Sequence, residues 1–105
     1  MAYVMIHFDR PTDTKGWSEY NRHVREWIAQ LLQISGAVSF VAYRTADESS
    51  PNTTAILELR SLDDARRALA SDEMKLVVQG LRSVGAIAKV ALAERSPFTP
   101  EPILA

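Results

Sequence analysis

The chain of 105 residues contains no cysteine, which excludes disulfide bonds, thiolate metal sites and a cysteine nucleophile. Its two histidines, His7 and His23, are not spaced i, i+4, so they form no zinc signature. A glycine-rich phosphate loop and a Gly-x-Ser-x-Gly nucleophile elbow are also absent. The sequence therefore predicts no metal site, and we expect no other cofactor.

The sequence also has no large excess of charge of one sign and no long hydrophobic run. The formal net charge is −1, which gives no basic stripe for nucleic acid or an anionic membrane surface. No apolar run approaches the ~20 residues that span a bilayer. The N-terminus has no basic region before its first apolar stretch, so a secretory signal is not expected. These observations predict a soluble cytoplasmic protein without nucleic-acid or membrane partners.

The apolar residues that are present follow two periods along the chain. Strand-like alternation covers residues 3–8, 36–44, 53–60 and 85–94, and helical periodicity covers residues 17–34 and 62–84. The second helical segment is either one kinked helix or two short ones, because Ser71 begins a second capping sequence. The order β-α-β-β-α-β predicts an α+β, ferredoxin-like fold: a four-stranded antiparallel sheet with strands one and three as central neighbours and the helices on one face. Residues 1–95 form this domain, and residues 96–105 are a proline-rich tail that cannot be a central strand.

Splitting each predicted strand by alternation separates two faces of the sheet. One face is purely apolar and belongs under the helices; it includes Val4, Ile6, Phe8, Ala55, Leu57 and Leu59. The other face is apolar but carries polar residues; it includes Tyr3, Met5, His7, Ile56, Glu58, Ile87 and Lys89. For residues 36–44 the alternation does not decide which side is covered. An uncovered apolar face predicts a homodimer through this face, with a cavity around its polar members.

The two histidines are the candidate acid or base groups. His23 lies at the border of the apolar stripe of the first helix, where Glu19 could orient it; the alternative is a boundary histidine packed against Trp27. His7 points into the mixed face, where Glu58 could reach it if the strand register allows. The alternative for Glu58 is a cross-strand ion-pair set with Arg60 and Lys89.

The segment Trp17-Ser-Glu-Tyr-Asn-Arg-His23, the strand Gly36-Ala-Val-Ser-Phe-Val-Ala-Tyr-Arg44 and the element order together resemble the dimeric α+β barrel superfamily. Its aromatic-x-x-Tyr-x-x-His pattern is similar to that of EthD-like proteins, and the general layout resembles the antibiotic-biosynthesis monooxygenases. The resemblance implies a homodimer whose two sheets form a barrel, with a ligand pocket between sheet and helices in each subunit. It also implies that His23 faces that pocket.

Two hypotheses for function follow. The first is a cofactor-independent enzyme, of monooxygenase or isomerase type, acting on a small aromatic or polyketide-like substrate. Its catalytic candidates are His23 and His7, and its substrate-binding candidates are Tyr3, Met5, Tyr20, Trp27, Phe40, Glu58 and Arg60. The second is a barrel that binds a small apolar or aromatic ligand, or is associated with stress, without catalysis. An RNA-binding module is set aside because the third strand lacks the aromatic and basic residues that stack bases.

Overall fold

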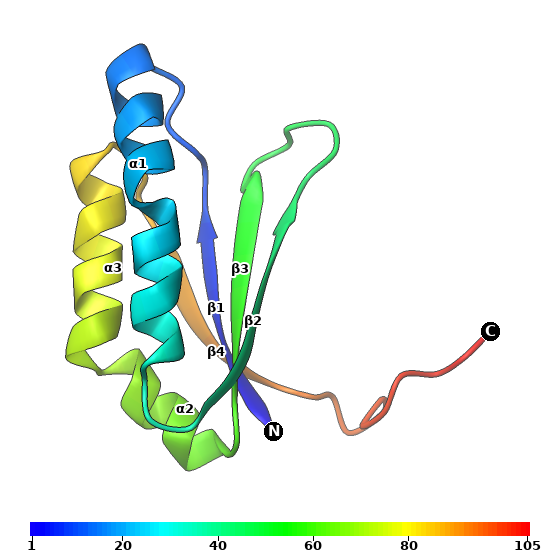
Figure 1. Ribbon diagram of the computed structural model, residues 1–105. Coiled ribbons are helices and arrows are strands. Elements are labelled where there is room, and N and C mark those ends of the chain that lie inside the picture. Colours follow the sequence, from blue (N-terminus) through cyan, green and yellow to red (C-terminus); the bar gives the residue numbers. More distant parts are fainter.

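A sheet of four antiparallel strands carries all the helices on one face (Figure 1). The computed structural model describes residues 1–105. Along the chain its elements are β1 (Ala2–Phe8), α1 (Thr14–Leu32), β2 (Ala37–Arg44), β3 (Thr53–Leu59), α2 (Leu62–Leu69), α3 (Asp72–Ser83) and β4 (Lys89–Glu94). The strand order is β2-β3-β1-β4, with β1 and β3 as the central neighbours. The predicted ferredoxin-like α+β fold is confirmed.

The two faces of the sheet differ in the way that alternation predicts. Val4 of β1 pairs with Leu57 of β3 and Leu92 of β4, and Ile6 pairs with Ala55 and Val90. These residues face the helices, and Val4, Ile6 and Leu57 are almost wholly buried. The residues between them face the other way, which we call the open face. Its three cross-strand rows are Ser39–Glu58–Tyr3–Ala93, Val41–Ile56–Met5–Ala91 and Tyr43–Thr54–His7–Lys89.

A β-bulge near the start of β2 explains why its sequence pattern was ambiguous. Ala37 pairs with Leu59 and Ser39 pairs with Glu58, so Val38 is an extra residue in β2. The bulge changes the phase of the alternation at this point. As a result Phe40 and Ala42 face the helices, and Val41 and Tyr43 lie on the open face.

Helix α1 begins three residues before the prediction and ends two residues before it. Asp13 caps the helix, and its carboxylate accepts a hydrogen bond from the Gly16 N–H at 2.9 Å. The cap therefore starts the helix at Thr14. At the other end Gly36, with φ of +88°, follows the last turn and leads into β2.

The second helical segment consists of two short helices, one of the two predicted alternatives. Ser71 ends the first and caps the second, with its hydroxyl accepting a hydrogen bond from the Met74 N–H. The predicted start of the last strand at residue 85 is wrong, because Gly85 and Ala86 complete the C-cap of α3. Gly85 adopts a φ of +92°, and the Ala86 N–H donates to the Leu81 carbonyl at 2.9 Å, as in a Schellman motif.

The chain beyond β4 forms neither helix nor strand. It leaves the sheet on the side opposite the helices and runs away from the rest of the subunit (Figure 1). Its first residue, Arg95, donates a hydrogen bond from Nε to the Tyr3 hydroxyl at 3.1 Å. The side chains of Phe98, Ile103 and Leu104 are exposed. No helix of the chain has both the length and the apolar content required to cross a membrane.

Candidate functional site

An apolar cavity lies between helices α1 and α3 and the covered face of the sheet. Thirteen residues line it and twelve of them are hydrophobic: Ile6, Phe8, Tyr20, Val24, Trp27, Ile28, Leu31, Phe40, Ala42, Ala55, Val77 and Leu81, with Thr53 as the remaining one. The cavity has a volume of about 60 Å³, and with its solvent-filled mouth the empty space reaches about 420 Å³. A dry cavity of about 150 Å³ takes up benzene. An aromatic ligand would therefore have to displace a half-buried lining side chain such as Phe40.

Aromatic rings form one wall of this cavity. The Tyr20 ring lies 6.0 Å from that of Phe8 and 6.1 Å from that of Trp27, measured between ring centroids. Trp27 can approach α3 only because residue 80 is glycine; a Cβ there would lie 2.6 Å from the indole Nε1. Glycine inside a helix costs roughly 1 kcal/mol relative to alanine. The close approach of the Trp27 indole, which lines the cavity, therefore explains the glycine at position 80.

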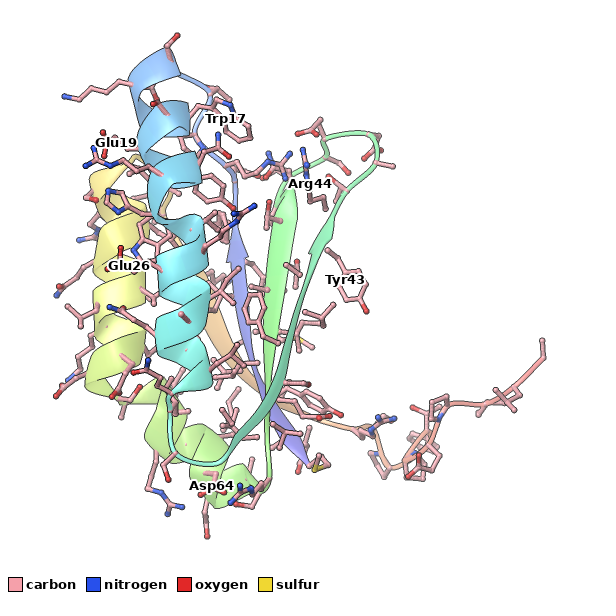
Figure 2. All side chains as sticks on the ribbon, viewed as in Figure 1. Trp17, Glu19, Glu26, Tyr43, Arg44 and Asp64 are labelled. Atoms are coloured by element: carbon pink, nitrogen blue, oxygen red, sulfur yellow. The ribbon has the colours of Figure 1, made fainter.

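The mouth of the cavity lies where α1 and the end of β2 face each other. Trp17 stacks on Tyr20 at 5.9 Å with an interplanar angle of 17°, yet 42% of Trp17 is exposed. Arg44 ends β2 and pairs with Thr53, which pairs with Phe8, and both partners line the cavity. Figure 2 shows Trp17 and Arg44 at the same end of the subunit, on facing elements, whereas Tyr43 points away from the helices.

Two arginines, Arg10 and Arg44, act by their charge on the Tyr20 phenol. Burial raises the pKa of the Tyr20 phenol, and the charges of Arg10 and Arg44 partly oppose that effect. Arg10 is itself buried and donates from Nη1 to the Thr53 hydroxyl at 2.7 Å. Its Nη2 donates to the Glu48 carboxylate at 2.7 Å. The charges of two guanidinium groups outside the cavity thus act on a neutral phenol that lines it.

The open face holds His7, and the predicted pairing of His7 with Glu58 is wrong. His7 lies between Thr54 and Lys89, and its Nδ1 is 3.0 Å from the Thr54 hydroxyl. Glu58 instead faces Tyr3 and accepts a hydrogen bond from the Ser39 hydroxyl at 3.3 Å. Glu58 is four positions along β3 from Thr54, about 13 Å along the strand. The register therefore keeps the imidazole and the carboxylate apart.

His23 lies outside the cavity, against the far side of Trp27. The two rings stack at 5.9 Å, and Trp27, not His23, lines the cavity. His23 Nε2 is 3.2 Å from the Glu19 carboxylate, the orienting contact that the sequence indicated. The position facing the pocket, which the resemblance implied, is not the one observed. The contact with Trp27 matches the alternative of a boundary histidine, and a catalytic role of His23 stays a prediction.

The predicted binding residues fall into two groups on opposite faces of the sheet. Tyr20, Trp27 and Phe40 line the cavity, whereas Tyr3, Met5 and Glu58 lie on the open face. Arg60 follows the end of β3, is exposed and forms no ion pair, so no ion-pair set with Glu58 and Lys89 exists. A single subunit cannot bring both groups to one ligand.

Sequence reasoning missed Thr53, the one residue of the cavity lining that is not hydrophobic, and its cross-strand partner Arg44, which lies beside the cavity without lining it. Both end strands, and Arg44 belongs to the one strand whose covered side the pattern did not decide. Because the bulge at Val38 sets the phase of β2, no local signal placed Arg44 on the cavity side. No group of three or more histidine, aspartate or glutamate side chains is placed to hold a metal ion.

Comparison with solved structures identifies the fold. SnoaB, a cofactor-independent oxygenase from Streptomyces nogalater, is 19% identical and superposes with a TM-score of 0.66 over 95% of this chain and 97% of that one. A candidate antibiotic biosynthesis monooxygenase from Deinococcus radiodurans is 13% identical, with a TM-score of 0.69 over 100% and 98% of the two chains. An EthD family protein from Bacillus halodurans is 14% identical, with a TM-score of 0.68 over 91% and 99%.

No protein-family model and no curated protein matches the sequence. At these identities the superpositions establish architecture and not activity. The chain has the subunit fold of the antibiotic-biosynthesis-monooxygenase-like and EthD-like proteins.

Proposed function

We propose that this protein is a cofactor-independent oxygenase that binds a small, planar aromatic or polyketide-like compound in the cavity between α1 and the sheet. The observation that carries the proposal is the cavity itself, which is almost wholly apolar and walled by the rings of Phe8, Tyr20 and Trp27. Concave apolar sites with few polar groups are typical of small-molecule binding. The shared fold with a cofactor-independent oxygenase supports the choice of reaction.

The reaction class needs a substrate that supplies its own electrons. A CH₂ group made acidic by neighbouring carbonyl or phenol groups loses a proton, and the carbanion adds O₂ to give a hydroperoxide. Loss of water then leaves a carbonyl, so that R₂CH₂ and O₂ give R₂C=O and H₂O. The protein has to exclude water from the ring, orient it and stabilise the anion. The apolar walls and the unpaired charge of Arg44 beside the cavity are suited to these tasks.

The histidines keep their proposed acid and base roles under specific geometric conditions. His23 would reach a ligand in the cavity only if the Trp27 indole, which lies between them, moved aside. His7 would act on a compound held between the open faces of two subunits, because it lies on the side away from the cavity. These conditions give each histidine a distinct test.

Non-catalytic binding of a small ligand is the second candidate function. It is favoured by one observation: no histidine, aspartate or glutamate lines the cavity. A site that only holds an apolar compound needs no such group, whereas proton transfer is ordinarily performed by one. Turnover therefore decides between the two candidates.

We further propose that two copies associate through their open faces. The central row of that face consists of Val41, Ile56, Met5 and Ala91, with no charged residue. Each large apolar side chain is worth about 1.5–3 kcal/mol when fully buried. A second copy is the occupant whose own open face offers the same apolar row, and the tail leaves each subunit on this side (Figure 1).

The test of the oxygenase proposal is oxygen uptake with a panel of hydroxyanthrones and quinols, with products identified by mass spectrometry. Ala42→Phe, which fills the cavity mouth, should abolish uptake, and Ala29→Phe on the exposed side of α1 should not. The variants His7→Ala and His23→Ala separate the two acid and base candidates. If no compound is turned over and neither histidine variant changes ligand affinity, the protein is a binding module and the enzyme proposal fails.

A further inference from the structure

Arg44 lies beside the cavity without lining it, and its charge has no ion-pair partner in the subunit. It is the last residue of β2, and its cross-strand partner Thr53 lines the cavity beside Phe8. The side chain therefore leaves the sheet on the covered side, at the end of the subunit that also carries Trp17 (Figure 2). Arg44 takes part in none of the ion pairs of the chain.

The carboxylates at this end are already engaged elsewhere. Glu48 is held by Arg10, and Asp13 caps α1. Asp9 accepts hydrogen bonds from the Ser50 hydroxyl at 2.6 Å and the Asn52 N–H at 2.8 Å. With one of the two arginines neutralised by Glu48, the mouth retains the positive charge of Arg44 above an apolar interior.

We propose that Arg44 is an anion-binding residue of the cavity, so that the ligand is a planar phenol or enol held as its oxyanion. The inference rests on the proposed binding of a planar compound in this cavity and adds the charge state of that compound. The apolar ring would lie among Tyr20, Trp27 and Phe40, and its oxygen would face the guanidinium. A planar guanidinium pairs well with oxyanions and is weakly hydrated, which suits a half-enclosed site.

The chemical consequence is a lowered pKa of the bound ligand. Its hydroxyl loses one proton to solvent, no electron is transferred in that step, and the negative charge remains on oxygen opposite Arg44. Such an oxyanion is the electron-rich form of the compound. In the proposed reaction it is the form that can react with O₂ without a cofactor.

The test uses 4-nitrophenol, whose phenolate is yellow, and 4-nitroanisole, a neutral analogue that cannot ionise. Wild-type protein should bind both compounds and shift the apparent pKa of 4-nitrophenol downward, seen as added phenolate absorbance at constant pH. Arg44→Gln should weaken phenolate binding by about tenfold, as expected for one partly exposed charged hydrogen bond, and abolish the shift. The same variant should leave the affinity for 4-nitroanisole within about twofold, the spread expected of a surface substitution.

Arg66→Gln is the matched control, because Arg66 is an exposed arginine on α2, at the far end of the subunit from Arg44. It removes the same charge and should leave both affinities unchanged. If both compounds bind, Ala42→Phe blocks both and Arg44→Gln weakens neither, the anion proposal is overturned while the cavity remains the site. If Ala42→Phe has no effect on either compound, or neither binds the wild type, the proposed function fails with it.

Discussion

The two faces of the sheet are formed by the same alternating strands, yet only one of them is covered by helices within the subunit. Leu57 is fully buried under the helices, while its neighbour Ile56 is only half-buried and lies on the open face. On β2 the contrast continues, since Phe40 packs against the core and Val41 is 42% exposed. The chain's own helices pack on the covered face. The open face is equally apolar at its centre and has no cover within the subunit.

This difference in cover gives the two faces of the sheet different roles. Residues of the covered face hold the subunit together, and the cavity next to α1, on the same side of the sheet, is the proposed ligand site. Residues of the open face contribute little to the subunit but are suited to association.

The largest expected effect comes from the neighbours Leu57 and Ile56. Leu57→Ala should lower the free energy of unfolding by about 3–4 kcal/mol, because it removes a fully buried side chain from the packed face. Ile56→Ala should cost about 1 kcal/mol in the subunit and remove any dependence of the unfolding midpoint on protein concentration. Urea unfolding at two concentrations measures both quantities. Equal losses at the two positions would contradict the division of the faces.

A charge on the open face should prevent association. Val41→Lys would place an unpaired ammonium against the partner's apolar row, so we expect a monomer at micromolar concentration by light scattering. Leu76→Lys is the control: Leu76 is 54% exposed on α3, on the helix side of the molecule. A wild-type monomer, or a Leu76→Lys variant that dissociates as readily, would refute the proposed dimer.

The tail beyond β4 should contribute a smaller part of the same interface. Removing residues 96–105 takes away the exposed side chains of Phe98, Ile103 and Leu104. We expect the dimer dissociation constant to rise by about tenfold, which corresponds to 1.4 kcal/mol. In a Val41→Lys background the same truncation should leave the free energy of unfolding unchanged. A loss of subunit stability there would place the tail in the fold instead of the interface.

The smallest effect concerns the cavity wall at alkaline pH. Burial raises the pKa of Tyr20 above its usual value of 10.0 in the folded protein, so the neutral phenol is favoured by folding. The resulting stability is present below pH 10 and is lost as the pH rises through the raised pKa. Tyr20→Phe should therefore show a shallower alkaline decline in unfolding free energy than wild type. Identical pH profiles would show that the phenol is not desolvated.

Much of the architecture follows from local sequence. The alternation in β1 and β3 predicts their faces, the order of elements predicts their central position, and Ser71 marks the break between α2 and α3. The residues that were misassigned at element ends belong to caps. Asp13 starts α1 early and Gly85 delays β4, because hydrogen bonds at helix ends decide boundaries that apolar periodicity does not register.

The site is less predictable, because it depends on register and packing between distant segments. Tyr20, Trp27 and Phe40 were substrate-binding candidates under the enzyme hypothesis; they line the cavity, and their role in binding stays a prediction. The pairing of His7 with Glu58 depended on the β1–β3 register, which alternation alone leaves undetermined. The place of Arg44 depended on a bulge at Val38, for which the sequence carries no clear signal.

Methyl NMR of the protein titrated with 4-nitroanisole is the most direct test of the proposal that a planar ligand binds in the cavity between α1 and the sheet. We expect ring-current shifts at methyl groups that line the cavity, those of Ile6, Val24, Ile28 and Leu31. Methyl groups of the open face, those of Val41 and Ile56, should stay unchanged because the sheet lies between them and the ligand. Shifts confined to Val41 and Ile56 would place the ligand on the open face and contradict the proposed site.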